Sequence, residues 1–343
     1  MLDRRPILIV PYMWIGDFVR CHTVVKLLKS RFPGRPVDVL STTLCAPLTD
    51  YMPDVRQAIV ADLPRKRLPV GEHKALADRL RREGYGTALI MPRTWKAALA
   101  PFLAGIPERI GWLGEWRFGL LNDLRWGERK RARMVDQCAA LALRAEAPPP
   151  EQWPLPELRV PAAEIAGWRE RFGLLHARPV VTLAPGAVGP SKRWPGVSYA
   201  ELARALIAQN CDVWIVGGPA EAALARIVRD EAPEVRDLTG TDLRNAILAL
   251  AASDVAISND SGLLHVAAAL GTQSIGIFGP TSAWHWGPLN PIAAAVEQTA
   301  EKLPCQPCHE PTCRLQHHRC MRNISPGQVL DIARETLGTA RVA

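Results

Sequence analysis

Short apolar runs alternate with longer amphipathic stretches along the whole chain, and this alternation predicts the secondary structure. Apolar runs of three to five residues are typical of buried strands, and apolar positions at helical spacing indicate helices. The expected strands are residues 7–10, 37–40, 58–60, 87–91, 180–183, 213–216, 235–238, 255–258 and 274–278. The expected helices are residues 16–31, 72–82 and 162–172, and helices that begin near Ser198, Ala220, Leu243 and Gly262.

Strands that alternate with helices in this way predict an α/β protein, in which helices cover both faces of a parallel sheet. The pattern starts again after a proline-bearing stretch, residues 148–161, so we expect two doubly wound units in tandem. Ligands of such sheets bind beyond the carboxyl ends of the strands, and two units that face each other form a cleft. The functional side chains are therefore expected in the turns that follow strands.

The stretch Val255–Gly271 contains the clearest of these turns. An apolar strand leads into the polar residues Asn259–Gly262, and a helix of apolar residues follows. The start of such a helix presents unpaired backbone N–H groups and the positive end of the helix dipole, which favours a phosphate. His265 lies one turn after Ser261 on the same helix face and is placed to donate to the same oxygens. The alternative is that Asp260 or Ser261 only caps the helix.

Length and composition agree with a globular protein of two domains. The chain has 343 residues, of which 48% are hydrophobic and 22% charged, and no apolar run approaches the length needed to span a bilayer. Its first residues enter a strand without the layout of a signal peptide, so we expect a cytoplasmic protein. The net charge is +8 and arginines gather in the first half, which suits an acidic small molecule or a lipid headgroup. No nucleic-acid partner is expected, because no helix alternates basic and aromatic residues.

Two further turns carry candidate residues for binding a nucleotide. Residues 185–195 follow a strand and place Lys192 where its positive charge would meet a pyrophosphate leaving group. The spacing is not that of a Walker A loop, which argues against a kinase or an ATPase, and an exposed surface lysine is the alternative. Glu221 follows Gly217–Gly218 at the next strand end, where a carboxylate accepts hydrogen bonds from ribose hydroxyls or, alternatively, only stabilises the helix dipole.

In the first half, Asp17 lies at the start of the first helix, across the expected cleft from Lys192. A carboxylate there would remove a proton from an acceptor hydroxyl as the hydroxyl attacks a sugar carbon, which is general-base catalysis. An ordinary helix N-cap is the alternative.

Half of the eight cysteines lie within sixteen residues: Cys305, Cys308, Cys313 and Cys320. Four soft ligands so close together suit zinc better than a disulfide framework in a cytosolic protein. Their spacing matches no standard zinc module, however, so a reduced, cysteine-rich loop is favoured over a structural metal. No Asp-x-Asp pair is present to hold a divalent ion on a nucleotide, and we expect neither a catalytic metal nor a cofactor.

Together these motifs resemble those of the bacterial lipopolysaccharide heptosyltransferases, glycosyltransferase family 9. In chain order the resemblance rests on Ile15-Gly16-Asp17, Ser191-Lys192-Arg193-Trp194-Pro195, Asn259-Asp260-Ser261-Gly262 with His265, Phe278-Gly279-Pro280-Thr281 and the cysteines near the end. Their order and separation match over nearly the whole chain. The cysteine-rich end is most similar to the heptosyltransferase II branch, whose members add the second heptose to the inner core.

The resemblance implies a GT-B fold of two Rossmann-like domains. Residues 1–160 would bind the acceptor, residues 174–325 would bind the ADP-sugar, and a final helix at residues 326–338 would pack back on the first domain. It further implies an inverting, metal-independent transfer of L-glycero-D-manno-heptose from ADP-heptose. The implied acceptor is Kdo2-lipid A that already bears a heptose, which a chain without an anchor of its own would meet peripherally, at the cytosolic face of the inner membrane.

Position by position, the resemblance makes Asp17 the base that acts on the acceptor hydroxyl. Lys96 and Arg93 would meet phosphate groups on the acceptor. With Glu221 at its ribose position, the expected donor-binding residues are Lys192, Glu221, Asp260, Ser261, Gly262 and His265.

Three other interpretations stay open at this point. A nucleotide-sugar epimerase of the same fold would alter the donor sugar without any acceptor. A heptosyltransferase I-type enzyme, or another transferase of the lipopolysaccharide core, would use a different acceptor. A catalytically silent binding protein would bind the ADP-sugar and release no ADP.

Overall fold

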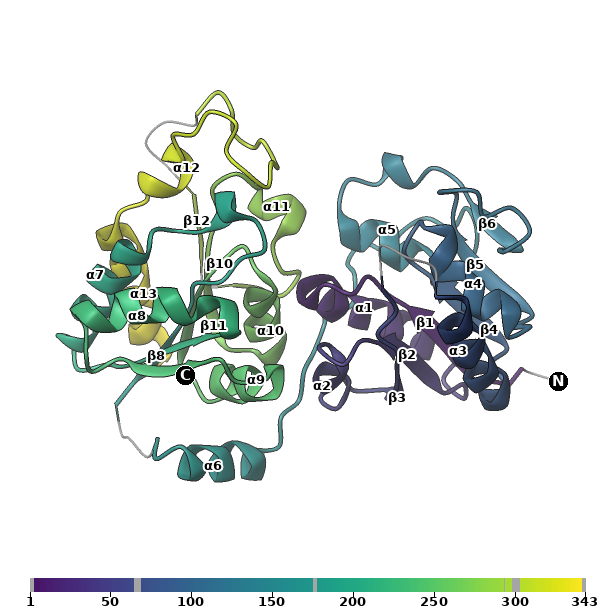
Figure 1. Cartoon of the computed structure of the whole chain (residues 1–343), viewed down its shortest axis with the longest axis horizontal. Helices are drawn as coiled ribbons and strands as arrows, with labels where there is room; N and C mark the ends of the chain where they lie inside the picture. Colours follow the sequence, from purple (N-terminus) through teal and green to yellow (C-terminus); the bar gives the residue numbers. More distant parts are fainter. Residues whose placement is uncertain (1–2, 65–68, 175–177, 293, 298–302, 341–343) are drawn as a thin grey trace. The chain divides into compact units, whose positions relative to one another are not determined.

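The computed structural model describes residues 3–64, 69–174, 178–292, 294–297 and 303–340, and it divides into two compact units, Met1–Glu157 and Leu158–Ala343. Each unit is built on one parallel six-stranded sheet with helices packed against it (Figure 1). The predicted α/β class with two doubly wound units is therefore confirmed. Among the described residues, no helix combines the length and the apolar character that a membrane span requires.

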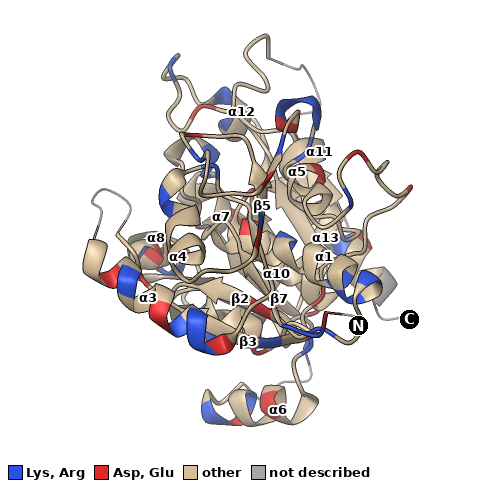
Figure 2. Cartoon of the chain, turned by 90° about the vertical axis from the view of Figure 1, so that its right-hand side faces the viewer, with Lys and Arg blue, Asp and Glu red and all other residues tan. Residues whose placement is uncertain are grey.

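In the first unit the strands follow the spatial order β3-β2-β1-β4-β5-β6. They are β1 Ile7–Val10, β2 Val37–Ser41, β3 Val55–Val60, β4 Thr87–Ile90, β5 Glu108–Trp112 and β6 Asp123–Arg125. The helices are α1 Ile15–Arg31, α2 Ala46–Thr49, α3 Val70–Glu83, α4 Trp95–Leu103 and α5 Met134–Ala140, with a 3-10 turn at Glu128–Lys130. Charged residues of both signs lie along α3, as Figure 2 shows. Its residues Leu76 and Leu80 are buried in the core against β1 and β4.

The second unit has the same order, β9-β8-β7-β10-β11-β12, when it is counted from its own first strand. Its strands are β7 Val180–Ala184, β8 Asp212–Gly217, β9 Arg236–Thr239, β10 Val255–Asn259, β11 Gln273–Ile277 and β12 Ala294–Val296. Its helices are α6 Ala162–Arg171, α7 Gly196–Ile207, α8 Ala222–Glu231, α9 Leu243–Ala251, α10 Gly262–Leu270, α11 Ala283–Trp286, α12 Arg319–Arg322 and α13 Pro326–Ala340, with 3-10 turns at Pro190–Lys192 and Pro219–Glu221.

Strand β7 shows why these central strands are almost entirely apolar in the sequence. Val181 and Leu183 join a core that contains residues of α7 and α13, whereas Val180 and Ala184 join a second core with residues of α6 and α9. Both faces of the strand are covered, so four of its five residues are apolar. The exception, Thr182, is fully buried, and its hydroxyl is hydrogen-bonded to that of Ser253.

The strands that the sequence pattern missed are β5, β6 and β12. Strand β5 begins with Glu108 and Arg109, β6 has the sequence Asp-Leu-Arg, and β12 is only three residues long. All three lie at or next to a sheet edge. Charged residues in β5 and β6, and the shortness of β12, remove the apolar pattern that marks the central strands.

The final helix, α13, contacts α7, β11 and β10. Its residues Val329 and Ala333 are fully buried in the core of the second unit. These contacts lie within the second unit, and the expected packing of this helix on the first domain stays a prediction.

The segment before the second unit is fastened to the first unit by side chains of α1. The fully buried His22 contacts the carbonyl oxygen of Pro53 through Nε2 at 2.8 Å, and its Nδ1 accepts the backbone N–H of Glu157 at 2.9 Å. Thr23 donates to the carbonyl of Pro154, and Lys26 pairs with Glu157. The imidazole is therefore neutral in the folded state, with its proton on Nε2.

We predict that His22 makes the first unit less stable in mild acid. Burial holds the pKa of His22 below its ordinary value of 6.5, so the unfolded chain binds the proton more readily than the folded chain. The stabilising contribution is present above that ordinary value and is lost as the pH falls below it, by at most about 1.4 kcal/mol per pH unit. Melting temperatures between pH 7.5 and 5.5 should fall more for the wild type than for His22→Gln. Parallel pH dependences would contradict the assignment.

Candidate functional site

The strand order of each sheet places a ligand site where the order reverses. In the first unit the reversal lies between β1 and β4, and in the second between β7 and β10. In doubly wound sheets the connections from such neighbouring strands run to opposite sides, and ligands bind beyond the carboxyl ends at this point. Asp17 and Lys192 follow β1 and β7, and Arg93 and Asp260 follow β4 and β10, so the candidate residues occupy both reversal points.

In the second unit, three strand ends meet at the carboxylate of Asp260. Lys192 Nζ donates to Asp260 Oδ2 at 2.7 Å, and Thr281 Oγ1 donates to the same oxygen, also at 2.7 Å. The side chain of Asp260 is 6% exposed and that of Lys192 is 28% exposed, so the ion pair is mostly shielded from water. The structure thus brings Lys192 and Asp260 together and adds Thr281, which follows β11. The sequence identified Thr281 only as part of a motif, because nothing in the pattern pairs it with Asp260.

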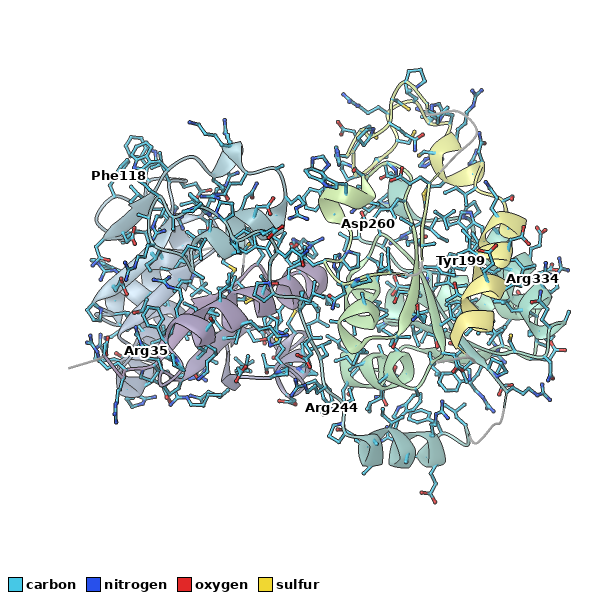
Figure 3. The ribbon with its side chains drawn as sticks, turned by 180° about the vertical axis from the view of Figure 1, so that it is seen from behind. Arg35, Phe118, Tyr199, Arg244, Asp260 and Arg334 are labelled. Atoms are coloured by element: carbon cyan, nitrogen blue, oxygen red, sulfur yellow. The ribbon has the colours of Figure 1, made fainter. Side chains whose placement is uncertain are left out.

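Asn259, the last residue of β10, fixes the turn before Asp260. Its side chain is fully buried, and its Nδ2 donates to the carbonyl of Pro185 at 2.6 Å. Its Oδ1 accepts the backbone N–H of Trp194 at 3.2 Å and the hydroxyl of Tyr199 at 3.1 Å. Both Asp260 and Tyr199 are labelled in Figure 3. One amide therefore joins the end of β10 to the turn that carries Lys192.

Helix α10 starts at Gly262 without a side-chain cap. Ser261 occupies the N-cap position, but its side chain makes no capping hydrogen bond, and its Oγ lies 2.9 Å from Ser258 Oγ. Ser261 and Gly262 are half-buried, whereas His265, one turn further, is only 4% exposed. The helix ends as the sequence predicts, at Gly271, whose φ of 79° suits glycine.

Glu221 lies just before α8, close to two glycines of neighbouring turns. Its Oε2 accepts the backbone N–H of Gly218 at 2.9 Å. A Cβ added at Gly186 or Gly217 would come within 2.9 or 2.7 Å of the Glu221 side chain, so both positions favour glycine. The requirement for glycine is strict at Gly217, which faces the Cβ of Glu221, whereas at Gly186 the nearest atoms are the movable end of that side chain. The carboxylate thus has a local structural contact, and its predicted role with a ribose stays a prediction.

The cysteines near the end of the chain are free thiols. Burial raises the pKa of Cys320 to about 11, whereas hydrogen bonds from backbone N–H groups lower the pKa of Cys313 below its ordinary value. Within the described part of the chain, no three His, Cys, Asp or Glu side chains are arranged to hold a metal ion.

In the first unit, Asp17 lies in the first turn of α1 and pairs with Arg20 one turn later. The two side chains are 13% and 7% exposed, so this ion pair is largely shielded. Burial raises the pKa of Tyr12 and that of Cys138 above their ordinary values, and the negative charge of Asp17 contributes to both shifts. No side-chain cap is present at the N-cap residue Trp14.

Arg93 and Lys96 lie between β4 and the first turn of α4. Arg93 is 48% exposed and pairs with Glu128 at 3.2 Å, and burial raises the pKa of this glutamate. The carbonyl of Arg93 accepts the N–H of Glu115, and a Cβ at Gly114 would lie 2.2 Å from that carbonyl, so this neighbour must be glycine. Lys96 is half-buried, and its charge helps to lower the pKa of His73.

The first unit also contains a cavity of about 240 Å³, which lies away from these residues. Its lining includes Ile7, Thr87 and Glu108, which are the first residues of β1, β4 and β5. The cavity is therefore at the amino ends of the strands, opposite the edge where Asp17 and Arg93 lie, and we do not assign it to the site.

Two doubly wound units in tandem, with charged side chains at both reversal points, are the architecture of the GT-B glycosyltransferases. The chain belongs to glycosyltransferase family 9, the heptosyltransferases, whose family model matches residues 73–319. The predicted GT-B fold, family and enzyme class are therefore confirmed.

Known relatives agree with this family. The chain is 36% identical over 305 residues to lipopolysaccharide heptosyltransferase 2 of Escherichia coli, covering 84% of this chain and 87% of the relative. It is 36% identical over 304 residues to lipooligosaccharide heptosyltransferase 2 of Haemophilus influenzae, covering 84% and 88%. The solved structure of E. coli ADP-heptose lps heptosyltransferase II superposes with a TM-score of 0.85 at 32% identity, over 98% of this chain and 99% of that one.

We predict that Asn259→Ala destabilises the second unit by roughly 2–4 kcal/mol. The substitution leaves the N–H of Trp194, the hydroxyl of Tyr199 and the carbonyl of Pro185 without their partner in a buried setting. Urea unfolding measures the loss. Asn323→Ala, at an exposed helix end, is the matched control and should change stability by less than about 0.5 kcal/mol. Equal effects of the two substitutions would argue against a central role for Asn259.

Proposed function

We propose that this glycosyltransferase adds the second heptose to the inner core of lipopolysaccharide, with ADP-heptose as the donor. The observation that carries the proposal is the cluster of Lys192, Asp260 and Thr281 at the reversal point of the second sheet. The similarity to heptosyltransferase 2 of E. coli and H. influenzae supports the choice of donor and acceptor.

On the donor side, we assign the diphosphate to Lys192 and to the start of α10. The ammonium group supplies a positive charge, and the helix start adds N–H groups and the positive end of its dipole at Ser261 and Gly262. Asp260 contacts the donor sugar, Glu221 the ribose, and His265 supports the phosphate-binding turn from within. As ADP departs, the ammonium group of Lys192 and the start of α10 stabilise the negative charge that develops on the diphosphate.

On the acceptor side, we assign the base to Asp17. Its carboxylate takes the proton of the acceptor hydroxyl while the hydroxyl oxygen bonds to the anomeric carbon of the donor heptose. The bond from that carbon to the diphosphate breaks at the same time, and ADP leaves with the electron pair. The configuration inverts, and the step needs no metal ion. Arg20 pairs with Asp17 and holds its carboxylate in place.

Arg93 and Lys96 are proposed to bind phosphate groups on Kdo2-lipid A that already bears one heptose. The side chain of Arg93 is 48% exposed, and Arg93 follows β4, the strand next to β1. An exposed position near Asp17 suits a residue that binds a large acceptor. We further propose that the enzyme works in the cytoplasm, at the cytosolic face of the inner membrane, which it contacts peripherally where its lipid acceptor lies.

We predict that Asp17→Asn lowers kcat by roughly 10²- to 10⁴-fold, because the amide cannot accept the proton. ADP affinity, measured by calorimetry, should change by less than about twofold, because the proposed donor contacts all lie in the second unit. Asp78→Asn is the matched control, since Asp78 also pairs with an arginine three residues later but on the exposed face of α3. Equal losses of turnover and of ADP affinity in Asp17→Asn would refute the assignment.

We predict that the enzyme adds a heptose only to an acceptor that already bears one heptose. The enzyme is incubated with ADP-heptose and core acceptors that bear zero, one or two heptoses, and mass spectrometry should show one added heptose only on the acceptor that bears one. Addition to the acceptor without heptose would indicate a heptosyltransferase I-type enzyme. A donor sugar altered without acceptor would indicate an epimerase, and donor binding without ADP release would indicate a silent binding protein.

With the preferred acceptor, Lys96→Ala should raise the acceptor KM by roughly tenfold, because one charge-assisted phosphate contact is lost.

A further inference from the structure

The segment at residues 303–318, which we name the cysteine-rich loop, has no place in the proposed reaction. It contains Cys305, Cys308 and Cys313 and leads into α12, where Cys320 and Met321 are buried in the core of the second unit. Its hydrogen bonds nevertheless end on the two turns that carry partners of Asp260.

The first contact is with the turn that carries Lys192. Ser191, the residue before the lysine, is 2% exposed, and its Oγ donates to the carbonyl of Glu310 at 2.5 Å. Its backbone N–H donates to the carbonyl of Pro311 at 3.2 Å. A Cβ added at Gly189 would lie 3.3 Å from the same Pro311 carbonyl, so the loop and the turn are closely packed.

The second contact is with the turn that carries Thr281. Gln306 Nε2 donates to the carbonyl of Gly279 at 2.7 Å, and the backbone N–H of His309 donates to the carbonyl of Pro280 at 2.9 Å. On the other side of this turn, a Cβ at Gly279 would come within 2.3 Å of the Met321 sulfur. The turn is therefore held between the loop and α12.

The loop also lies near the ion pair of Lys192 and Asp260. Trp286 Nε1 donates to His309 Nδ1 at 3.2 Å, which leaves the proton of a neutral imidazole on Nε2. The charges of Lys192 and Asp260 both affect the pKa of His309, which partial burial and nearby His285 and Lys192 lower below its ordinary value. The imidazole therefore lies within electrostatic range of both members of the pair.

From these contacts we infer that the cysteine-rich loop positions the donor-binding cluster, and that Ser191 is a positioning residue that acts through Lys192. A turn that becomes ordered when its lysine binds a diphosphate loses backbone freedom, and a turn already fixed by the loop does not incur that cost. The inference rests on the proposed role of Lys192 in binding the donor. It gives the loop a function that requires no metal.

The test is a double-mutant cycle on ADP affinity, measured by calorimetry with the full chain. Lys192→Met should weaken ADP binding by roughly 10- to 100-fold, and Ser191→Ala by roughly 3- to 10-fold. The double variant should bind ADP no more weakly than Lys192→Met alone, because Ser191 acts through the lysine. Steady-state kinetics of Ser191→Ala should show a raised KM for ADP-heptose and an unchanged KM for the acceptor.

Ser198→Ala is the matched control, because Ser198 lies in the first turn of α7 and not against the loop; its ADP affinity should equal that of the wild type. If Ser191→Ala folds poorly, Gln306→Ala tests the second contact, paired with Thr281→Val in the same kind of cycle. Additive losses in the cycle would overturn the positioning role of the loop. So would an unchanged ADP affinity in both loop variants while Lys192→Met binds ADP weakly; either result leaves the donor role of Lys192 standing. An unchanged affinity in Lys192→Met would overturn the donor role of the lysine and the inference with it.

Discussion

The carboxylate of Asp260 is the group on which the site of the second unit depends. A charge that is almost fully removed from water is costly unless it is paired and hydrogen-bonded. Here a single oxygen accepts both the ammonium of Lys192 and the hydroxyl of Thr281. Because these partners follow β7 and β11, while Asp260 follows β10, compensation of one buried charge brings three strand ends together.

The hydrogen bonds of the neutral amide of Asn259, the residue before Asp260, also join neighbouring segments of the backbone. Asn259 uses three of the four hydrogen-bonding positions of its amide on Pro185, Trp194 and Tyr199, and so fixes where the turn after β10 begins. A rigid turn matters for a transferase, because its side chains and N–H groups are already in position. They need not reorganise when charge develops on the leaving group. The cysteine-rich loop extends the same principle from the strand ends to the two turns around them.

The two units repeat one topology but present different chemistry at their reversal points. In the second unit the groups are a lysine, a buried carboxylate and an uncapped helix start, which suit a diphosphate. In the first unit Asp17 pairs with Arg20, and Arg93 is largely exposed. Because one sheet order sets both positions, the proposed division into a donor side and an acceptor side depends on side chains and not on the fold.

The sequence by itself determined the central strands, the class of fold and the places of the candidate residues. Strands such as β1 and β7 are covered on both faces, so nearly all of their positions are apolar, and Asp17, Lys192 and Asp260 were found because they follow such runs. Strands β5, β6 and β12 escaped, since charged residues interrupt the first two and the third is only three residues long. Only the tertiary structure decided that Thr281 shares an oxygen with Lys192, that Arg20 pairs with Asp17 and that Ser191 meets Glu310. Ser191 and Glu310 lie 119 positions apart, and local spacing carries no information about contacts that only the folded backbone creates.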